Sequence, residues 1–137
     1  MKITITCALL VLAVLSGCQK GESTHSSKIK AGMIKMAILY PNGEGKKFDM
    51  DYYSSKHMPM AVSLFGESLR AMSIDKGLSA GAPESTAPYL AVGYFYFDDI
   101  KSLQSAIGPN SEKLRADIPN YTNIQPVILI SEVLKPE

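Results

Sequence analysis

The sequence predicts a single α+β domain, and the length of the chain and the order of its elements lead to this class. The chain has 137 residues, of which 46% are hydrophobic, so it is long enough to bury one core. Runs typical of strands and helices follow one another in the order strand, helix, strand, strand, helix, strand. Lys and Arg together number 14 and Asp and Glu 13, so no excess of charge indicates a nucleic-acid surface. We therefore expect no nucleic-acid partner.

The first strand is expected over residues 33–40, because apolar side chains recur there at every second position. They share one face of the strand, opposite Lys35, and are Ile34, Met36, Ile38 and Tyr40. Residues 41–45, Pro-Asn-Gly-Glu-Gly, are dense in turn formers and end the strand.

Asp49 predicts that the first helix begins at Met50, because its carboxylate can cap the free N–H groups of the first turn. We expect this helix to end near His57. Pro59 lacks an N–H group and disfavours helical angles at the residue before it, so the helix should break there. Because proline suits a first helical position, a second helical segment is expected from Pro59 to about Phe65.

The remaining elements are expected as a strand over residues 69–78, a loop over 79–88, a strand over 89–97, a helix over 100–107, a short helix over 112–117 and a strand over 124–134. Residues 89–97 are rich in Tyr, Phe and Val, and both faces of this strand are apolar. Asp98 and Asp99 can cap the helix that follows. Pro126 indicates an edge strand or a strand end.

The order of these elements is the split β-α-β-β-α-β of the ferredoxin-like fold, in which an antiparallel four-stranded sheet carries both helices on one face. The last two strands are apolar on both sides, so the second face of the sheet also needs cover. Packing against another copy would bury it, and we expect a homodimer that forms a dimeric α+β barrel. The alternative, a monomer with a solvated sheet face, would need polar residues in the strand over 89–97, which has none.

The first residues predict a separate targeting segment. Lys2 is followed by the uncharged, largely apolar run of residues 3–15, which is too short to cross a membrane as a helix. Residues 15–18, Leu-Ser-Gly-Cys, resemble a bacterial lipobox, in which the peptide is cut before a lipid-modified Cys18. We expect a signal peptide over residues 1–17, a lipidated Cys18 with a flexible tether over 18–32, and the folded domain over 33–137. The lipid would anchor the protein in the cell envelope. Gln19 favours the outer membrane, facing the periplasm, if the source is Gram-negative.

Tyr53 and His57 are the candidate catalytic residues, because they lie four positions apart and so share one face of the predicted helix. An imidazole can serve both as general acid and as general base near neutral pH. The alternative is that His57 only caps free carbonyls at the helix end. Tyr40 and Asp49 are candidate substrate contacts, although Asp49 also suits a helix cap. Tyr52 faces about 100° away and is interpreted as a packing residue.

Several kinds of site are excluded by the sequence. The predicted domain has one His and no Cys, which is too few ligands for a zinc site, and we expect no metal. The sequence contains neither of the glycine-rich phosphate-binding patterns, G-x-G-x-x-G and G-x-x-x-x-G-K-[ST]. We therefore expect no cofactor.

Three segments resemble the EthD family. They are residues 38–43 (Ile-Leu-Tyr-Pro-Asn-Gly), residues 48–59 (Phe-Asp-Met-Asp-Tyr-Tyr-Ser-Ser-Lys-His-Met-Pro) and residues 117–123 (Asp-Ile-Pro-Asn-Tyr-Thr-Asn). The resemblance implies a small dimeric α+β barrel. Members are often labelled as reductases or oxidoreductases, and a related muconolactone-type isomerase branch uses the helix-borne His in acid–base chemistry without a cofactor.

The resemblance and the residues together predict an enzyme of oxidoreductase or isomerase type that needs no cofactor. His57 would act as general acid and base on a small apolar oxygenated or aromatic compound. The alternative is a non-catalytic carrier of such a ligand, or an accessory protein to a degradative oxygenase.

Overall fold

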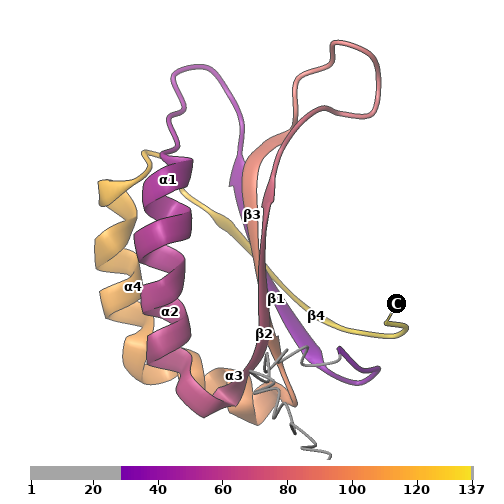
Figure 1. Ribbon diagram of the computed structural model, residues 1–137, viewed down its shortest axis with the longest axis vertical. Coiled ribbons are helices and arrows are strands. Elements are labelled where there is room, and N and C mark those ends of the chain that lie inside the picture. The colour runs from indigo at the N-terminus through magenta and orange to yellow at the C-terminus, as the bar shows by residue number, and fades with distance from the viewer. Residues whose placement is uncertain (1–28, 137) are drawn as a thin grey trace, which may run out of the picture.

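Four antiparallel strands form one sheet in the order β2-β3-β1-β4 in the computed structural model, which describes residues 29–136 (Figure 1). The strands are β1 (Ile34–Pro41), β2 (Leu69–Lys76), β3 (Tyr89–Phe97) and β4 (Val127–Glu132). This strand order, with its helical connections after β1 and β3, is the ferredoxin-like arrangement that the sequence predicted. The prediction of the fold is confirmed.

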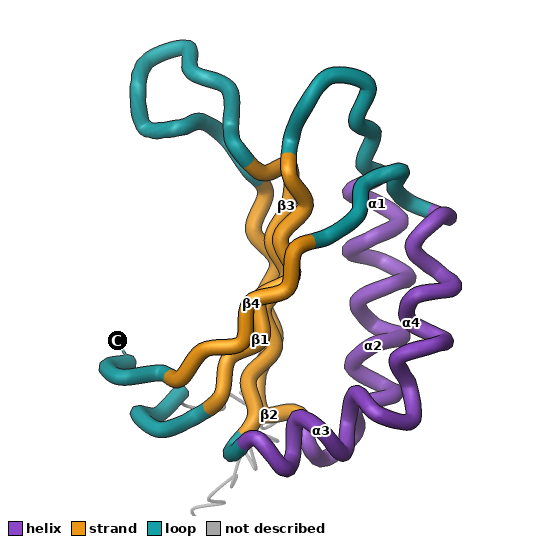
Figure 2. The backbone as a smooth tube through the Cα atoms, turned by 180° about the vertical axis from the view of Figure 1, so that it is seen from behind, coloured by secondary structure: helices purple, strands orange, loops and turns teal. Residues whose placement is uncertain are grey.

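The helices all cover the same face of the sheet (Figure 2). They are α1 (Met50–Tyr52), a π-helical turn (Tyr53–His57), α2 (Met58–Phe65), α3 (Ile100–Ile107) and α4 (Ser111–Asp117). Short 3₁₀ turns follow α2, α3 and α4, at Gly66–Ser68, Gly108–Asn110 and Ile118–Asn120. The elements β3 and α3 have the predicted bounds, and Asp99 caps α3 through the N–H of Ser102.

The first helix does not break at Pro59, and this part of the prediction is wrong. The N–H of Met58 bonds to the carbonyl of Tyr53, five residues earlier, and Met58 keeps helical angles of φ −67° and ψ −42°. A π-helical turn thus leads directly into α2, where Pro59 occupies the first turn. The chain is helical without interruption from Met50 to Phe65.

The last strand is shorter than predicted. Ile124 is only 3% exposed and belongs to the core, but it lies before β4 in an irregular segment. Its apolar character therefore reflects burial of a loop residue and not membership of the sheet. Pro126 has no N–H for the ladder, and β4 begins at the next residue.

The core fills the space between sheet and helices. Phe65 of α2 packs edge-to-face on Phe95 and Phe97 of β3, with ring centroids 5.1 and 5.8 Å apart. The largest fully buried side chains are Tyr40, Tyr53, Phe97 and Met58. Two of these carry a hydroxyl group, so the core contains polar atoms that need partners.

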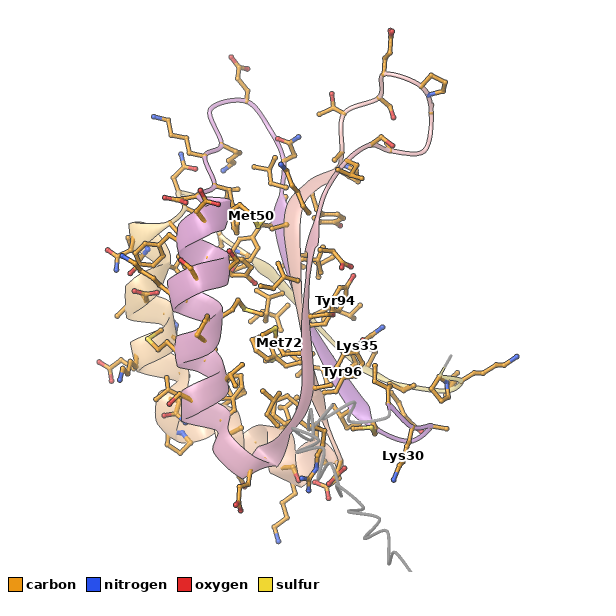
Figure 3. All side chains as sticks on the ribbon, viewed as in Figure 1. Lys30, Lys35, Met50, Met72, Tyr94 and Tyr96 are labelled. Atoms are coloured by element: carbon orange, nitrogen blue, oxygen red, sulfur yellow. The ribbon has the colours of Figure 1, made fainter. Side chains whose placement is uncertain are left out.

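The other face of the sheet carries no helix. Tyr94 and Tyr96 of β3 point to this side, together with Lys35 of β1 (Figure 3). In the ladder Tyr94 is opposite Ala37, which in turn is opposite Leu129 of β4, and Leu129 is 53% exposed. We call this surface the open face.

The chain before β1 joins the end of β4. The N–H of Gly32 bonds to the carbonyl of Val133, and the N–H of Val133 bonds to the carbonyl of Met33, both at 2.8 Å. The predicted signal peptide (residues 1–17), Cys18 and most of the tether lie outside the described residues and stay predictions. Within residues 29–136 no helix has the length and apolar character needed to cross a membrane.

Gly93 allows the first helix to approach the sheet. A Cβ at this position of β3 would overlap the hydroxyl of Tyr53 and press on the side chain of Met58. We predict that Gly93→Ala lowers the free energy of unfolding by about 1–3 kcal/mol, as overpacking does in other cores.

Gly108→Ala is the matched control for this substitution in chemical denaturation. Gly108 has φ −48°, and nothing lies within 4 Å of an added Cβ, so the control should be neutral or slightly stabilising. Equal stability of Gly93→Ala and the wild type would contradict the close approach.

Candidate functional site

A cavity of about 390 Å³ lies between the sheet and the helices. Its wall is mostly apolar and is formed by β1, the first helix, α3, α4 and the chain around the start of β4. Its polar lining residues are Tyr40, Tyr53, His57, Ser111, Arg115, Tyr121 and Gln125. An apolar cavity of this size with a few convergent polar groups is typical of a site for a small ligand.

The π-helical turn places Tyr53 and His57 on the wall of this cavity. Tyr53 is 1% and His57 7% exposed, and their rings stack with centroids 5.6 Å apart and an interplanar angle of 16°. The prediction that the two residues share one helix face is confirmed. Single π-helical turns within α-helices occur frequently at functional sites, because the extra residue changes the direction of the side chains.

Asp117, at the end of α4, holds the imidazole of His57. The His57 Nδ1 and Asp117 Oδ2 atoms are 2.8 Å apart. The second oxygen, Asp117 Oδ1, accepts hydrogen bonds from the Tyr52 hydroxyl at 3.0 Å and from Asn120 Nδ2 at 2.8 Å. An ionised carboxylate only accepts, so Nδ1 of His57 carries the proton and donates it. In the neutral imidazole this leaves Nε2 as the atom that accepts a proton.

The hydrogen bonds keep Asp117 ionised. Partial burial by itself raises the pKa of this carboxyl, but the hydrogen bonds from His57, Asn120 and Tyr52 outweigh burial and lower the pKa below its usual value. Asp117 is therefore a permanent acceptor at neutral pH, and its role toward His57 does not change over the physiological range.

Tyr121 connects His57 to a cluster of buried hydroxyl groups. The Tyr121 and Tyr40 hydroxyl oxygens are 2.7 Å apart, and the Tyr121 hydroxyl lies 3.4 Å from Nε2 of His57. Burial is the main cause that raises the pKa of Tyr40, Tyr53 and Tyr121 well above the ordinary value. These phenols therefore stay protonated and can donate hydrogen bonds, but they are not bases at neutral pH.

Three of the four predicted site residues come together in the cavity wall, namely His57, Tyr53 and Tyr40. Asp49 does not belong to the residues that line the cavity. It is exposed, and its Oδ1 accepts the N–H of Tyr52 at 2.9 Å, so it caps the helix. Tyr52, interpreted as a packing residue, supports Asp117 through its hydroxyl. The predicted lipidation site, Cys18, lies outside the described residues.

Asp117 and Tyr121 received no role from the sequence. Both lie in the segment 117–123 that carries part of the family resemblance, so a signal was present. No spacing rule connects that segment to His57, which is 60 residues earlier than Asp117. Within the part of the chain that the structure describes, no group of three or more His, Cys, Asp or Glu side chains is arranged to hold a metal ion.

Comparisons with known proteins agree with the fold and the motifs. The family model of the EthD domain matches residues 42–125. The crystal structure of an EthD-like protein from Ralstonia eutropha JMP134 is 35% identical, covers 77% of this chain and 96% of its own, and superposes with a TM-score of 0.73.

A more distant structure shows the fold alone. It is an EthD family protein from Bacillus halodurans C-125, with 24% identity, coverage of 74% of this chain and 98% of its own, and a TM-score of 0.52. A search of curated proteins gives no match.

The lowered pKa of Asp117 predicts a pH-dependent contribution to stability. In the unfolded chain the pKa of an Asp carboxyl is about 3.9, and above this pH the ionised Asp117 contributes its full stabilisation to the fold. This contribution is lost as the pH falls through the lower pKa that Asp117 has in the folded protein. At pH 7 we expect Asp117→Asn to be less stable than the wild type by about 1 kcal/mol. This difference should narrow between about pH 5 and pH 2.

Urea denaturation at a series of pH values measures this difference. Glu44→Gln removes an exposed carboxylate from the loop after β1 and serves as the control. A stability difference for Asp117→Asn that does not change with pH would refute the role of the ionised carboxylate.

Proposed function

The chain belongs to the EthD family, and on this premise we propose that it is a cofactor-independent enzyme in which His57 acts as general acid and base on a small, apolar, oxygenated compound. One observation carries the proposal. An imidazole oriented by a carboxylate lies in the wall of a largely apolar cavity, with Nε2 facing Tyr121 and Nδ1 held by Asp117. This is the arrangement of a base and its orienting group.

The cavity supports a small substrate. Its volume of about 390 Å³ is at the lower end of the range for ligand sites, which is about 300–1,000 Å³. Apolar side chains such as Met36, Ile38 and Phe65 form much of the wall, so an apolar ring or short chain would be desolvated there. Tyr53 and Tyr121 are protonated donors to a substrate oxygen.

The chemistry that fits best is a proton shift next to a carbonyl group. Nε2 of His57 takes a proton from one carbon while a tyrosine hydroxyl hydrogen-bonds to the carbonyl oxygen, on which negative charge develops. The imidazolium then returns the proton to another carbon, which completes an isomerisation. Asp117 stabilises the imidazolium between the two steps. An oxidation would need an electron acceptor in addition.

A non-catalytic carrier is the second candidate, and one observation favours it. Within residues 29–136 every fully buried side-chain nitrogen or oxygen has a hydrogen-bond partner. The Tyr40–Tyr121 pair and the His57–Asp117 pair are therefore satisfied without a ligand. A wall of this kind can hold an apolar compound without reacting with it.

We predict that His57→Gln abolishes proton exchange. The purified full chain is incubated in deuterium oxide with angelica lactone or cyclohexenone, and deuterium incorporation is followed by NMR. Loss of a general acid–base should slow the incorporation by about 10²–10⁴-fold. Ser54→Gln, which introduces the same side chain at an exposed site on the same turn, should retain the wild-type rate.

The outcome separates the two candidates. Binding of these compounds by both the wild type and His57→Gln with equal affinity, and without exchange, would identify a carrier.

We also infer that the protein is a homodimer that buries the open face against a second copy. The middle of this face is apolar across three adjacent strands, at Tyr94, Ala37 and Leu129. On β4, Val127 and Leu129 point to this side and are 52% and 53% exposed. A contiguous apolar surface of this kind is typical of a protein interface.

A matched pair of substitutions tests the dimer by sedimentation velocity. Leu129 on the open face is 53% exposed and Ile100 on α3 is 47% exposed, so a lysine at either position leaves the core intact. We expect Leu129→Lys to be monomeric, because it places a charge in the interface, and Ile100→Lys to remain dimeric. A monomeric wild type, or a dimeric Leu129→Lys, would reject this interface.

A further inference from the structure

The helix α4 turns one side toward the cavity. Ser111, Leu114 and Arg115 of α4 line it, followed by Ile118 at the start of the next 3₁₀ turn, and their spacing of three, four and seven residues is that of one helix face. Arg115 thus lies on the side of the helix that lines the cavity. Lys113, two positions earlier, is about 200° away around the helix and does not line the cavity.

Arg115 brings a positive charge to the cavity that the proposed acid–base chemistry does not use. No Asp or Glu belongs to the cavity lining, and among residues 29–136 no carboxylate lies within ion-pair distance of the Arg115 guanidinium. Arg115 lines the cavity and is also exposed, so it lies at the opening of the cavity. A cation near a helix C-terminus is favourable in itself, but that preference does not place it on the cavity face.

We propose that the cavity takes a small carboxylic acid, with its carboxylate bound by Arg115 at the opening and its apolar body inside. The proposal rests on the proposed function, since it names the substrate class of the same site. A guanidinium presents two parallel N–H donors that match a carboxylate. A phosphate fits less well, because it carries more negative charge than a carboxylate and Arg115 lies in the last turn of α4, at the partially negative end of the helix.

Two fixed points would orient such a substrate. The carboxylate stays at the opening with Arg115, and the apolar wall directs the other end toward Nε2 of His57. An orienting contact distant from the reacting atoms determines which carbon meets the base, and this favours one reaction over others. The single charged contact also separates acids from neutral compounds of the same shape.

Binding of matched probe pairs tests this inference. The probes are para-toluate against para-toluamide, and cyclohexanecarboxylate against cyclohexanecarboxamide, titrated calorimetrically into the full chain at pH 7. In the wild type each carboxylate should bind about tenfold more tightly than its amide, because its hydrogen bonds to Arg115 are charge-assisted. Arg115→Gln should abolish this preference and Arg115→Lys should retain part of it. Lys113→Gln removes one positive charge from the same helix and should keep the full preference.

Three results would overturn the inference. They are a wild type that does not distinguish acid from amide, an Arg115→Gln variant that retains the preference, and the absence of binding by every probe. The His57→Gln variant tests whether the imidazole, and not Arg115, holds the carboxylate. We expect this variant to keep the preference for the carboxylate over the amide. An Arg115-dependent preference without deuterium exchange would reject the proposed enzyme and leave the carboxylate site standing.

Discussion

The hydrogen bond between His57 and Asp117 is the constraint on which the site depends. It joins the first helix to the end of α4, 60 residues apart, over 2.8 Å. Asp117 is held in turn by Tyr52 from the first helix and by Asn120 from the following turn, so the carboxylate is fixed from three directions. An imidazole fixed in this way has one nitrogen assigned as donor, and the other is left to face the cavity. The proposed acid–base chemistry of the cavity rests on this pairing.

This geometry depends on two local features of the fold, the π-helical turn and Gly93. The π-helical turn adds one residue to a helical turn, and it brings Tyr53 and His57 onto the cavity wall together. Gly93 then gives the Tyr53 hydroxyl room beside β3. Burial in turn raises the pKa of the phenols, so the tyrosines remain donors. The protonated state of these tyrosines is thus a consequence of their burial between the helix and the sheet.

Local signals predicted most of the fold, and they singled out Tyr40, Tyr53 and His57 but not Asp117 or Tyr121. Asp49 and Asp99 cap their helices and the composition of residues 89–97 is that of a strand, so α3 and β3 were predicted residue by residue. The π-helical turn was missed, because a proline after a helical stretch predicts a break unless the hydrogen-bond register shifts. Asp117 was missed for a different reason. Its contact with His57 depends on the packing of two helices, and no periodicity in the sequence reports that contact.

The sheet lies between the cavity and the open face, and the side chains of the edge strand β4 alternate between these two sides. Ile128 lines the cavity on the helical side, while Leu129 faces away from the helices. Both side chains are more than half exposed, so the cavity wall is incomplete at this edge of the sheet. A second copy seated on the open face would restrict the movement of β4 and therefore of Ile128. In the proposed dimer, one edge strand therefore takes part in both the subunit interface and the cavity wall, whereas the proposed base, His57, is held by α4.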